Sequence, residues 1–115
     1  MNSLPELTRA ILDFRDARDW KQFHNHKDMA LSLMLEAAEV AEHFQWKNPA
    51  EIEAFLAQDR EQLADELSDV LYWTLLIASD SGIDLASAFS SKLKKNEQKY
   101  PLEKSRGRHT KYDRL

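Results

Sequence analysis

The sequence predicts an all-α protein, a compact helical bundle of about four main helices plus one short helix. The 115 residues include only 2 Gly and 3 Pro, which are too few for the turns of a β-sandwich or barrel. Hydrophobic residues make up 43% of the chain, enough for one core, and they recur at helical spacing in several segments. A chain of this length holds about one domain, so we expect residues 1–115 to form a single domain.

The first helix is expected over about residues 4–18. Ser3 is followed three residues later by Glu6, the pattern of a capping box, and Pro5 is tolerated in the first helical turn. The stretch 19–26 is polar and aromatic without a clean period, which indicates a connection.

The second and third helices follow Asn residues. Asn25 or His26 precedes a long apolar segment, which predicts a helix over about 27–46. Asn48 precedes a Pro at the first helical position, which predicts a short helix over roughly 49–57.

Two further long helices complete the bundle. Apolar residues at helical spacing predict a helix over about 60–79, and Gly82 suits the left-handed position that ends it. Asp84 can cap a helix over about 85–99, which Pro101 prevents from continuing.

Cysteine content and hydropathy exclude several classes of protein. With 0 Cys, the chain has no disulfide scaffold, thiolate metal site or Cys nucleophile. No apolar run approaches the roughly 20 residues of a membrane span, and the N-terminus lacks the features of a signal peptide. We expect a soluble, cytoplasmic protein without a membrane partner.

Charge is distributed unevenly along the chain. Residues 1–91 hold 7 Lys and Arg against 17 Asp and Glu, a net of −10, whereas residues 92–115 hold 9 against 3, a net of +6. Residues 102–115 are also aperiodic, which predicts a basic C-terminal tail. Basic tails often bind nucleic acid, but the acidic body argues against that partner.

Each of two predicted helices carries a narrow polar band in apolar surroundings. At about 100° per residue, four side chains of the segment 27–46 fall in one band about 60° wide: Ser32, Glu36, Glu39 and His43. Four side chains of the segment 60–79 do the same: Gln62, Glu66, Asp69 and Trp73. A solvated helix has the reverse pattern, so we expect the two acid pairs to face each other.

Four converging carboxylates predict a site for a hard divalent cation. Oxygen ligands suit Mg²⁺ or Mn²⁺, with water and substrate phosphate completing the octahedron. A di-iron centre would need Glu-x-x-His pairs, which the chain lacks. Glycine is too scarce for a nucleophile elbow or a phosphate-binding loop.

The ordered motifs resemble a known family. Glu36-x-x-Glu39, 26 residues, and then Glu66-Leu67-Ser68-Asp69 resemble the ExxE…ExxD signature of the MazG-like all-α nucleotide pyrophosphohydrolases. Further motifs, spread over nearly the whole chain, resemble the dCTP pyrophosphatase branch: Phe14-Arg15 to Asp19-Trp20, Gln22-Phe23-His24, Phe44-Gln45-Trp46-Lys47, Asp65 to Leu71, Lys92-x3-Asn96-x2-Lys99-Tyr100-Pro101 and Ser105-Arg106-Gly107 to Lys111-Tyr112.

The resemblance implies a Mg²⁺-dependent house-cleaning enzyme that hydrolyses dCTP, or a related dNTP such as a 5-modified one, to the monophosphate and pyrophosphate. By that likeness the catalytic and metal-binding residues would be Glu36, Glu39, Glu66 and Asp69. Many members carry a further Glu where this chain has Leu35. A broad-specificity NTP or dNTP pyrophosphohydrolase is the alternative within the same class.

Substrate-binding residues are expected at three aromatic positions and in the basic C-terminal part. Trp20, Trp46 and Trp73 would contact the base, with His24 nearby as a polar reader. The phosphates would meet cations and polar groups from the last helix and the tail: Lys92, Asn96, Lys99, Tyr100 and Arg106. His26 and His43 are given no role.

The predicted assembly is a homo-oligomer, because a helix that is apolar nearly all round cannot hide its surface in one small layer. The family resemblance implies a dimer or a tetramer built as a dimer of dimers. A rival hypothesis from another class is a non-catalytic helical interaction module, which would bind through the basic tail in a salt-dependent way.

Overall fold

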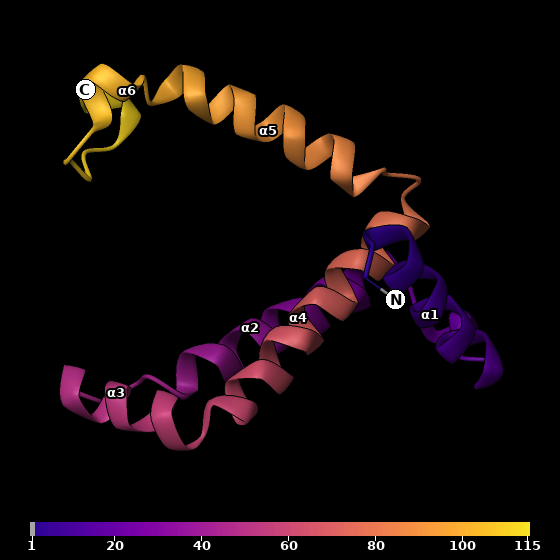
Figure 1. Ribbon diagram of the computed structural model, residues 1–115. Coiled ribbons are helices and arrows are strands. Elements are labelled where there is room, and N and C mark those ends of the chain that lie inside the picture. Colours follow the sequence, from indigo (N-terminus) through magenta and orange to yellow (C-terminus); the bar gives the residue numbers. More distant parts are fainter. Residues whose placement is uncertain (1) are drawn as a thin grey trace. The chain divides into compact units, whose positions relative to one another are not determined.

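The computed structural model describes residues 2–115, and every regular element in that range is helical (Figure 1). The prediction of an all-α fold is confirmed. The elements are α1 (Leu4–Ala17), η1 (Lys21–Phe23), α2 (His26–Glu42), α3 (Pro49–Gln58), α4 (Arg60–Asp80), α5 (Leu85–Lys99), α6 (Leu102–Ser105) and η2 (Tyr112–Arg114).

Local capping explains where α1, α2 and α3 begin. The Ser3 hydroxyl accepts a hydrogen bond from the Glu6 amide at 3.2 Å, and the Asn25 side chain accepts one from the Asp28 amide at 2.9 Å. Asn48 forms a complete capping box at the start of α3. Each cap satisfies an amide that has no partner within its own helix.

The chain divides into two units, of which the first ends at Gly82. In this unit α2 and α4 pack side by side and run in opposite directions (Figure 1). The start of α2 meets the end of α4, where His26 Nε2 lies 3.0 Å from Ser81 Oγ. Near the other end of the pair, His43 Nε2 lies 3.8 Å from Glu66 Oε1.

Helices α1 and α3 complete the first unit by packing on α4. Arg15 of α1 is only 2% exposed and donates two hydrogen bonds to the Asp80 carboxylate, at 2.8 and 2.9 Å. The described part of the chain has a small apolar core: Met29, Phe55, Leu75, Leu76 and Ala78. A bidentate ion pair between Arg15 and Asp80 therefore sits beside a small core and ties α1 to α4.

A large apolar surface remains uncovered on α2 and α4. Leu31, Met34 and Leu35 of α2 are 46%, 58% and 61% exposed, and Leu67 of α4 is 50% exposed. Exposed apolar surface of this kind is typical of a protein that associates.

The predicted end of the second helix is wrong. The helix stops at Glu42 rather than at 46, because the Phe44 and Gln45 amides both bond to the Ala41 carbonyl and the chain turns away. Trp46 then adopts a left-handed backbone, with φ of +69°. The left-handed conformation expected at Gly82 is confirmed, since its φ is +66°.

The second unit, Ile83–Leu115, contains α5, α6 and η2. The tail was expected to be aperiodic from residue 102, but it holds a short helix and a 3₁₀ turn. The carbonyl of Pro101 accepts hydrogen bonds from the amides of Lys104 and Ser105, which close the helical turn. In the segment 19–26, expected to be irregular, residues Lys21–Phe23 likewise form a 3₁₀ turn. None of the helices in residues 2–115 is long and apolar enough to cross a membrane.

Candidate active site

Three carboxylates converge between α2 and α4. Glu36 and Glu39 lie one turn apart on α2, and Glu66 faces them from α4. One carboxylate oxygen from each of the three lies within 4.8 Å of the others. Asp69, one turn after Glu66, falls outside this group of three but lies close enough to raise the pKa of Glu36. We call these four residues the acidic cluster.

The acidic cluster is electrostatically strained. Burial, followed by the charges of Glu39 and Asp69, raises the pKa of Glu36. The pKa of Glu66 is raised to about 7, first by a hydrogen bond with Glu39, then by burial and by the charges of the other three acids. Carboxylates in this state repel one another unless a proton or a cation lies between them.

Two carboxylate oxygens of the acidic cluster lack a hydrogen-bond partner among the described residues. Glu36 Oε2 and Glu66 Oε2 are both buried and have no hydrogen-bond partner in the described part of the chain. Buried polar atoms normally have one, so these two positions call for a ligand. An all-oxygen donor set with unsatisfied atoms fits a hard divalent cation better than a soft one.

An aromatic cavity of about 630 Å³ adjoins the acidic cluster. Glu36 and Asp69 belong to its wall, and most of the remaining lining is apolar or aromatic: Leu7, Ala10, Ile11, Phe14, Trp20, His24, Ser68, Leu71, Tyr72, Trp73 and Leu75. We call it the aromatic pocket. It brings Trp20, His24 and Trp73 together beside two of the acids, and it has the size and composition of a small-molecule site.

His24 is the polar group set among these rings. Its imidazole meets Trp73 edge to face, with ring centroids 5.4 Å apart, and its Nδ1 is buried without a hydrogen-bond partner within residues 2–115. Burial, followed by the positive charge of Arg15, lowers the pKa of His24. His24 is therefore neutral at pH 7 and can exchange a hydrogen bond with a ligand in the pocket.

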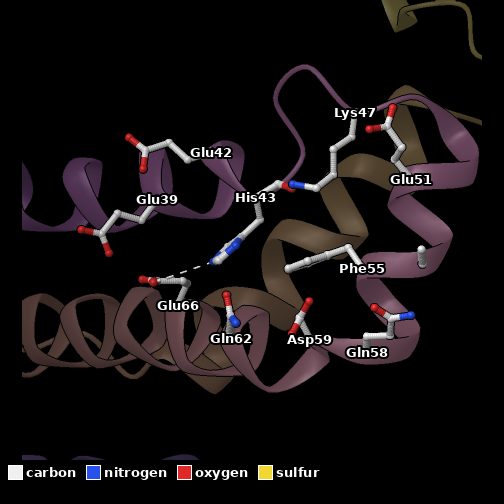
Figure 2. A pocket seen from close by; sticks show the side chains of 11 residues that line it. Glu39, Glu42, His43, Lys47, Glu51, Phe55, Gln58, Asp59, Gln62 and Glu66 are labelled. Carbon is white, nitrogen blue, oxygen red and sulfur yellow. Dashed lines mark hydrogen bonds and ion pairs between the residues drawn. The ribbon is translucent and has the colours of Figure 1, made fainter.

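A second cavity, of about 830 Å³, lies on the other side of Glu39 and Glu66, toward α3. Figure 2 shows its polar lining, with the His43 imidazole directed from the end of α2 toward Glu66. The His43 ring stacks on Phe55 of α3, with centroids 5.1 Å apart and planes inclined by 25°. Lys47 Nζ donates a hydrogen bond to the His43 carbonyl.

Trp46, the third expected base-binding aromatic, is not brought to the aromatic pocket. Its side chain is 91% exposed and it is absent from the lining of both cavities. The turn after Glu42 takes it out of the helix, in which position 46, seven residues after Glu39, would have continued the polar band.

The basic residues expected to contact phosphate all belong to the second unit. Lys92, Asn96 and Lys99 lie on α5, where spacings of four and three place them on one face. The Tyr100 amide donates to the Asn96 carbonyl at 2.9 Å, and Arg106 follows the end of α6. Lys99 Nζ lies 4.6 Å from the centroid of the Tyr112 ring, a cation–π contact.

Sequence reasoning gave no site role to eight residues that line the aromatic pocket, and Ser68 and Tyr72 are the two of them with polar side chains. Tyr72 meets Trp73 and Phe14 edge to face, with centroids 5.1 and 6.3 Å apart. A signal was present, because Ser68 and Tyr72 lie four residues apart and so share one side of α4, next to Asp69. The contact of His43 with Glu66 also had a signal, because His43 shares the polar band of Glu36 and Glu39, and Glu66 belongs to the band expected to face it.

Comparison with known proteins finds several close likenesses. dCTP pyrophosphatase 1 of Rattus norvegicus is 40% identical over 115 aligned residues, which cover 98% of this chain and 68% of the rat protein. dCTP pyrophosphatase 1 of Homo sapiens is 36% identical with the same coverage. Among solved structures, a pyrophosphatase from Archaeoglobus fulgidus superposes with a TM-score of 0.79 at 35% identity, over 84% of this chain and 91% of that one.

A family model also matches most of this chain. The model for the MazG-like family matches residues 31–115, which include both acid pairs and the whole second unit. Together with the all-helical fold and the relatives' identities, the match shows that this chain belongs to the MazG-like family.

Proposed function

We propose that this chain is a divalent-metal-dependent nucleoside triphosphate diphosphatase, which converts dCTP or a related, including 5-modified, dNTP to the monophosphate and pyrophosphate. The observation that carries the proposal is the acidic cluster, placed against an aromatic pocket large enough for a nucleobase. Relatives of 36–40% identity named dCTP pyrophosphatase 1 give the same reaction class and point to the same base.

The acidic cluster would hold Mg²⁺, with Mn²⁺ as a substitute. The unpartnered oxygens of Glu36 and Glu66 fit such an ion, and Glu39 and Asp69 complete a four-carboxylate set. When bound, Mg²⁺ would neutralise the negative charge of the triphosphate and lower the pKa of a bound water molecule. Because four carboxylates would otherwise repel the substrate, the chain by itself cannot receive a triphosphate there.

The chemical step is an in-line displacement at the α-phosphorus. A water oxygen forms a bond to that phosphorus, the bond to the oxygen bridging the α- and β-phosphates breaks, and pyrophosphate leaves. A carboxylate of the acidic cluster would accept the proton that the water loses. The residues of the cluster thus orient the reactants and remove the proton.

The aromatic pocket would receive the base. Trp20 and Trp73 offer ring faces for stacking, and neutral His24 offers one hydrogen-bonding atom. Trp46, exposed in this chain, would complete the base site only if another part of the assembly covers it. Lys92, Asn96, Lys99, Tyr100 and Arg106 would bind the phosphates.

The exposed apolar residues of α2 and α4 support a homo-oligomer, a dimer or a dimer of dimers. One family model covers residues 31–115, in both units, and the relatives align over 98% of the chain, which supports the treatment of residues 1–115 as one functional domain. The enzyme would act on the cytoplasmic nucleotide pool.

Incubation with a panel of nucleoside triphosphates and Mg²⁺, with products resolved by ion-exchange chromatography, tests the proposal. We expect dCTP or a 5-substituted dCTP to be consumed fastest, with monophosphate and pyrophosphate formed in equal amounts. Equal turnover of purine and pyrimidine nucleotides would favour the broad-specificity alternative. Release of a diphosphate and inorganic phosphate would contradict the proposed reaction.

A further inference from the structure

His43 lies next to the acidic cluster without belonging to it. Its Nε2 is 3.8 Å from Glu66 Oε1, yet it is not among the ligand atoms that gather within 4.8 Å of one another. Nε2 is buried and has no hydrogen-bond partner among the residues described. A buried ring nitrogen beside a carboxylate normally forms a hydrogen bond, and here Glu66 is the acid within reach.

On its other side, the imidazole packs against an aromatic ring. It stacks on Phe55, which is 8% exposed and which in turn meets Phe44 edge to face at 5.8 Å. Lys47 Nζ donates a hydrogen bond to the His43 carbonyl and lies 5.1 Å from the centroid of the Phe55 ring. The ring therefore cannot easily turn away from α4, and a shift of roughly 0.8 Å brings Nε2 into hydrogen-bonding range of Glu66.

The two oxygens of Glu66 are differently placed. Oε1 lies 3.8 Å from His43 Nε2, whereas Oε2 is buried and has no hydrogen-bond partner within residues 2–115. A donor on one carboxylate oxygen fixes the rotation of the group, and so fixes where the other oxygen points.

We propose that His43 is a positioning residue: its Nε2–H donates to Glu66 Oε1 and so holds Glu66 Oε2 toward a divalent cation. The inference rests on the proposed function, because it assumes that the acidic cluster binds that cation. The proposal gives a function to the contact between His43 and Glu66 in the cavity next to α3, which the acid motifs alone do not predict (Figure 2).

The test compares three variants by their Mn²⁺ affinity, measured by electron paramagnetic resonance without nucleotide. His43→Phe keeps a ring on Phe55 but removes the donor, and it should raise the Kd for Mn²⁺ about 10-fold. His43→Gln restores an N–H at similar reach and should recover most of the affinity. His26→Phe is the matched control, because His26 also links α2 to α4 but at the far end, and it should bind as the wild type does.

A kinetic measurement separates positioning from a general loss of structure. For His43→Phe we expect the Mg²⁺ concentration at half-maximal rate to rise by a similar factor. At saturating Mg²⁺, the KM for the nucleotide should stay at the wild-type value. Wild-type Mn²⁺ affinity in His43→Phe, or equally weak binding in His43→Gln, would overturn the inference.

A measurement on the unaltered protein covers the case in which a variant fails to fold. Mg²⁺ should shift the ¹⁵N resonance of His43 Nε2 and slow the exchange of its proton, as the hydrogen bond to Glu66 tightens. An unchanged His43 signal in a protein that binds Mg²⁺ would overturn the inference while leaving the proposed function intact. Failure of the wild type to bind either cation would overturn both.

Discussion

Replacing Glu66 with Gln should stabilise the metal-free protein above neutral pH while it weakens cation binding. The pKa of Glu66 is raised to about 7 in the folded protein, most of all by its hydrogen bond with Glu39. A carboxyl whose pKa is raised on folding binds more protons in the folded chain than in the unfolded one, between the two pKa values. Stability then falls as the pH rises through that interval, and a Gln at this position removes the effect.

The interval extends from the ordinary value of 4.5 to about 7. At pH 6, Glu66 would be about 90% protonated in the folded chain and about 3% in the unfolded one, a difference of roughly 0.9 proton. In EDTA, the midpoint of thermal unfolding should therefore fall more steeply between about pH 5 and pH 8 for the wild type than for Glu66→Gln. A cation at about 100 times its Kd adds roughly 2.7 kcal/mol to the native state, so excess Mg²⁺ should raise the wild-type midpoint by several degrees.

Thermal unfolding followed by circular dichroism, with EDTA and with excess Mg²⁺, measures both effects. Asp65→Asn is the matched control, because it removes one negative charge from α4 at an exposed position outside the acidic cluster. Glu66→Gln should be at least as stable as the wild type in EDTA near pH 8 and should gain little from Mg²⁺. A Glu66→Gln protein that is destabilised in EDTA and still gains the full Mg²⁺ shift would refute the reasoning, since Glu66 would then be structural.

Three further substitutions have distinct expected outcomes. Trp73→Ala should raise the KM for dCTP about 10-fold at unchanged Mn²⁺ affinity, because stacking on a base is worth roughly 1–3 kcal/mol; an unchanged KM in steady-state assays would place the base elsewhere. Asp80→Asn leaves Arg15, 2% exposed, without its charged partner and should cost roughly 3–5 kcal/mol in urea unfolding. Arg15 lowers the pKa of Asp80, so this contribution is present near neutral pH and is lost as the pH falls through the lowered value, and a variant with wild-type stability at pH 7 would contradict it. Leu76→Ala, at a position 0% exposed, should cost about 2–5 kcal/mol in the same assay, and a loss below about 1 kcal/mol would show that the core there readjusts.

The starts of α1, α2, α3 and α5 could be predicted because their signals are local. Ser3, Asn25, Asn48 and Asp84 each accept a hydrogen bond from an amide three residues later, and that requirement is written in adjacent residues. The end of α2 was predicted wrongly because apolar periodicity continues past Glu42. The turn that ends the helix depends on two amides that share the Ala41 carbonyl, and the residue types at these positions do not predict such a turn.

The placement of the site could be predicted only in part. Acids at i and i+3 share a helix face by geometry, so the spacing indicated which side chains of α2 and α4 would lie together. The spacing did not separate Asp69, which borders the aromatic pocket, from the three acids that converge. The ion pair of Arg15 with Asp80 joins residues 65 positions apart, and local patterns carry no information at that distance.

A crystal structure with Mn²⁺ and a dCTP analogue that cannot be cleaved between the α- and β-phosphates tests the proposed site most directly. We expect the anomalous signal of Mn²⁺ to lie between α2 and α4, in contact with carboxylate oxygens of Glu36, Glu39, Glu66 and Asp69. The cytosine should lie in the aromatic pocket against Trp73. A Mn²⁺ signal away from these carboxylates, or a cytosine bound outside that pocket, would contradict the proposed active site.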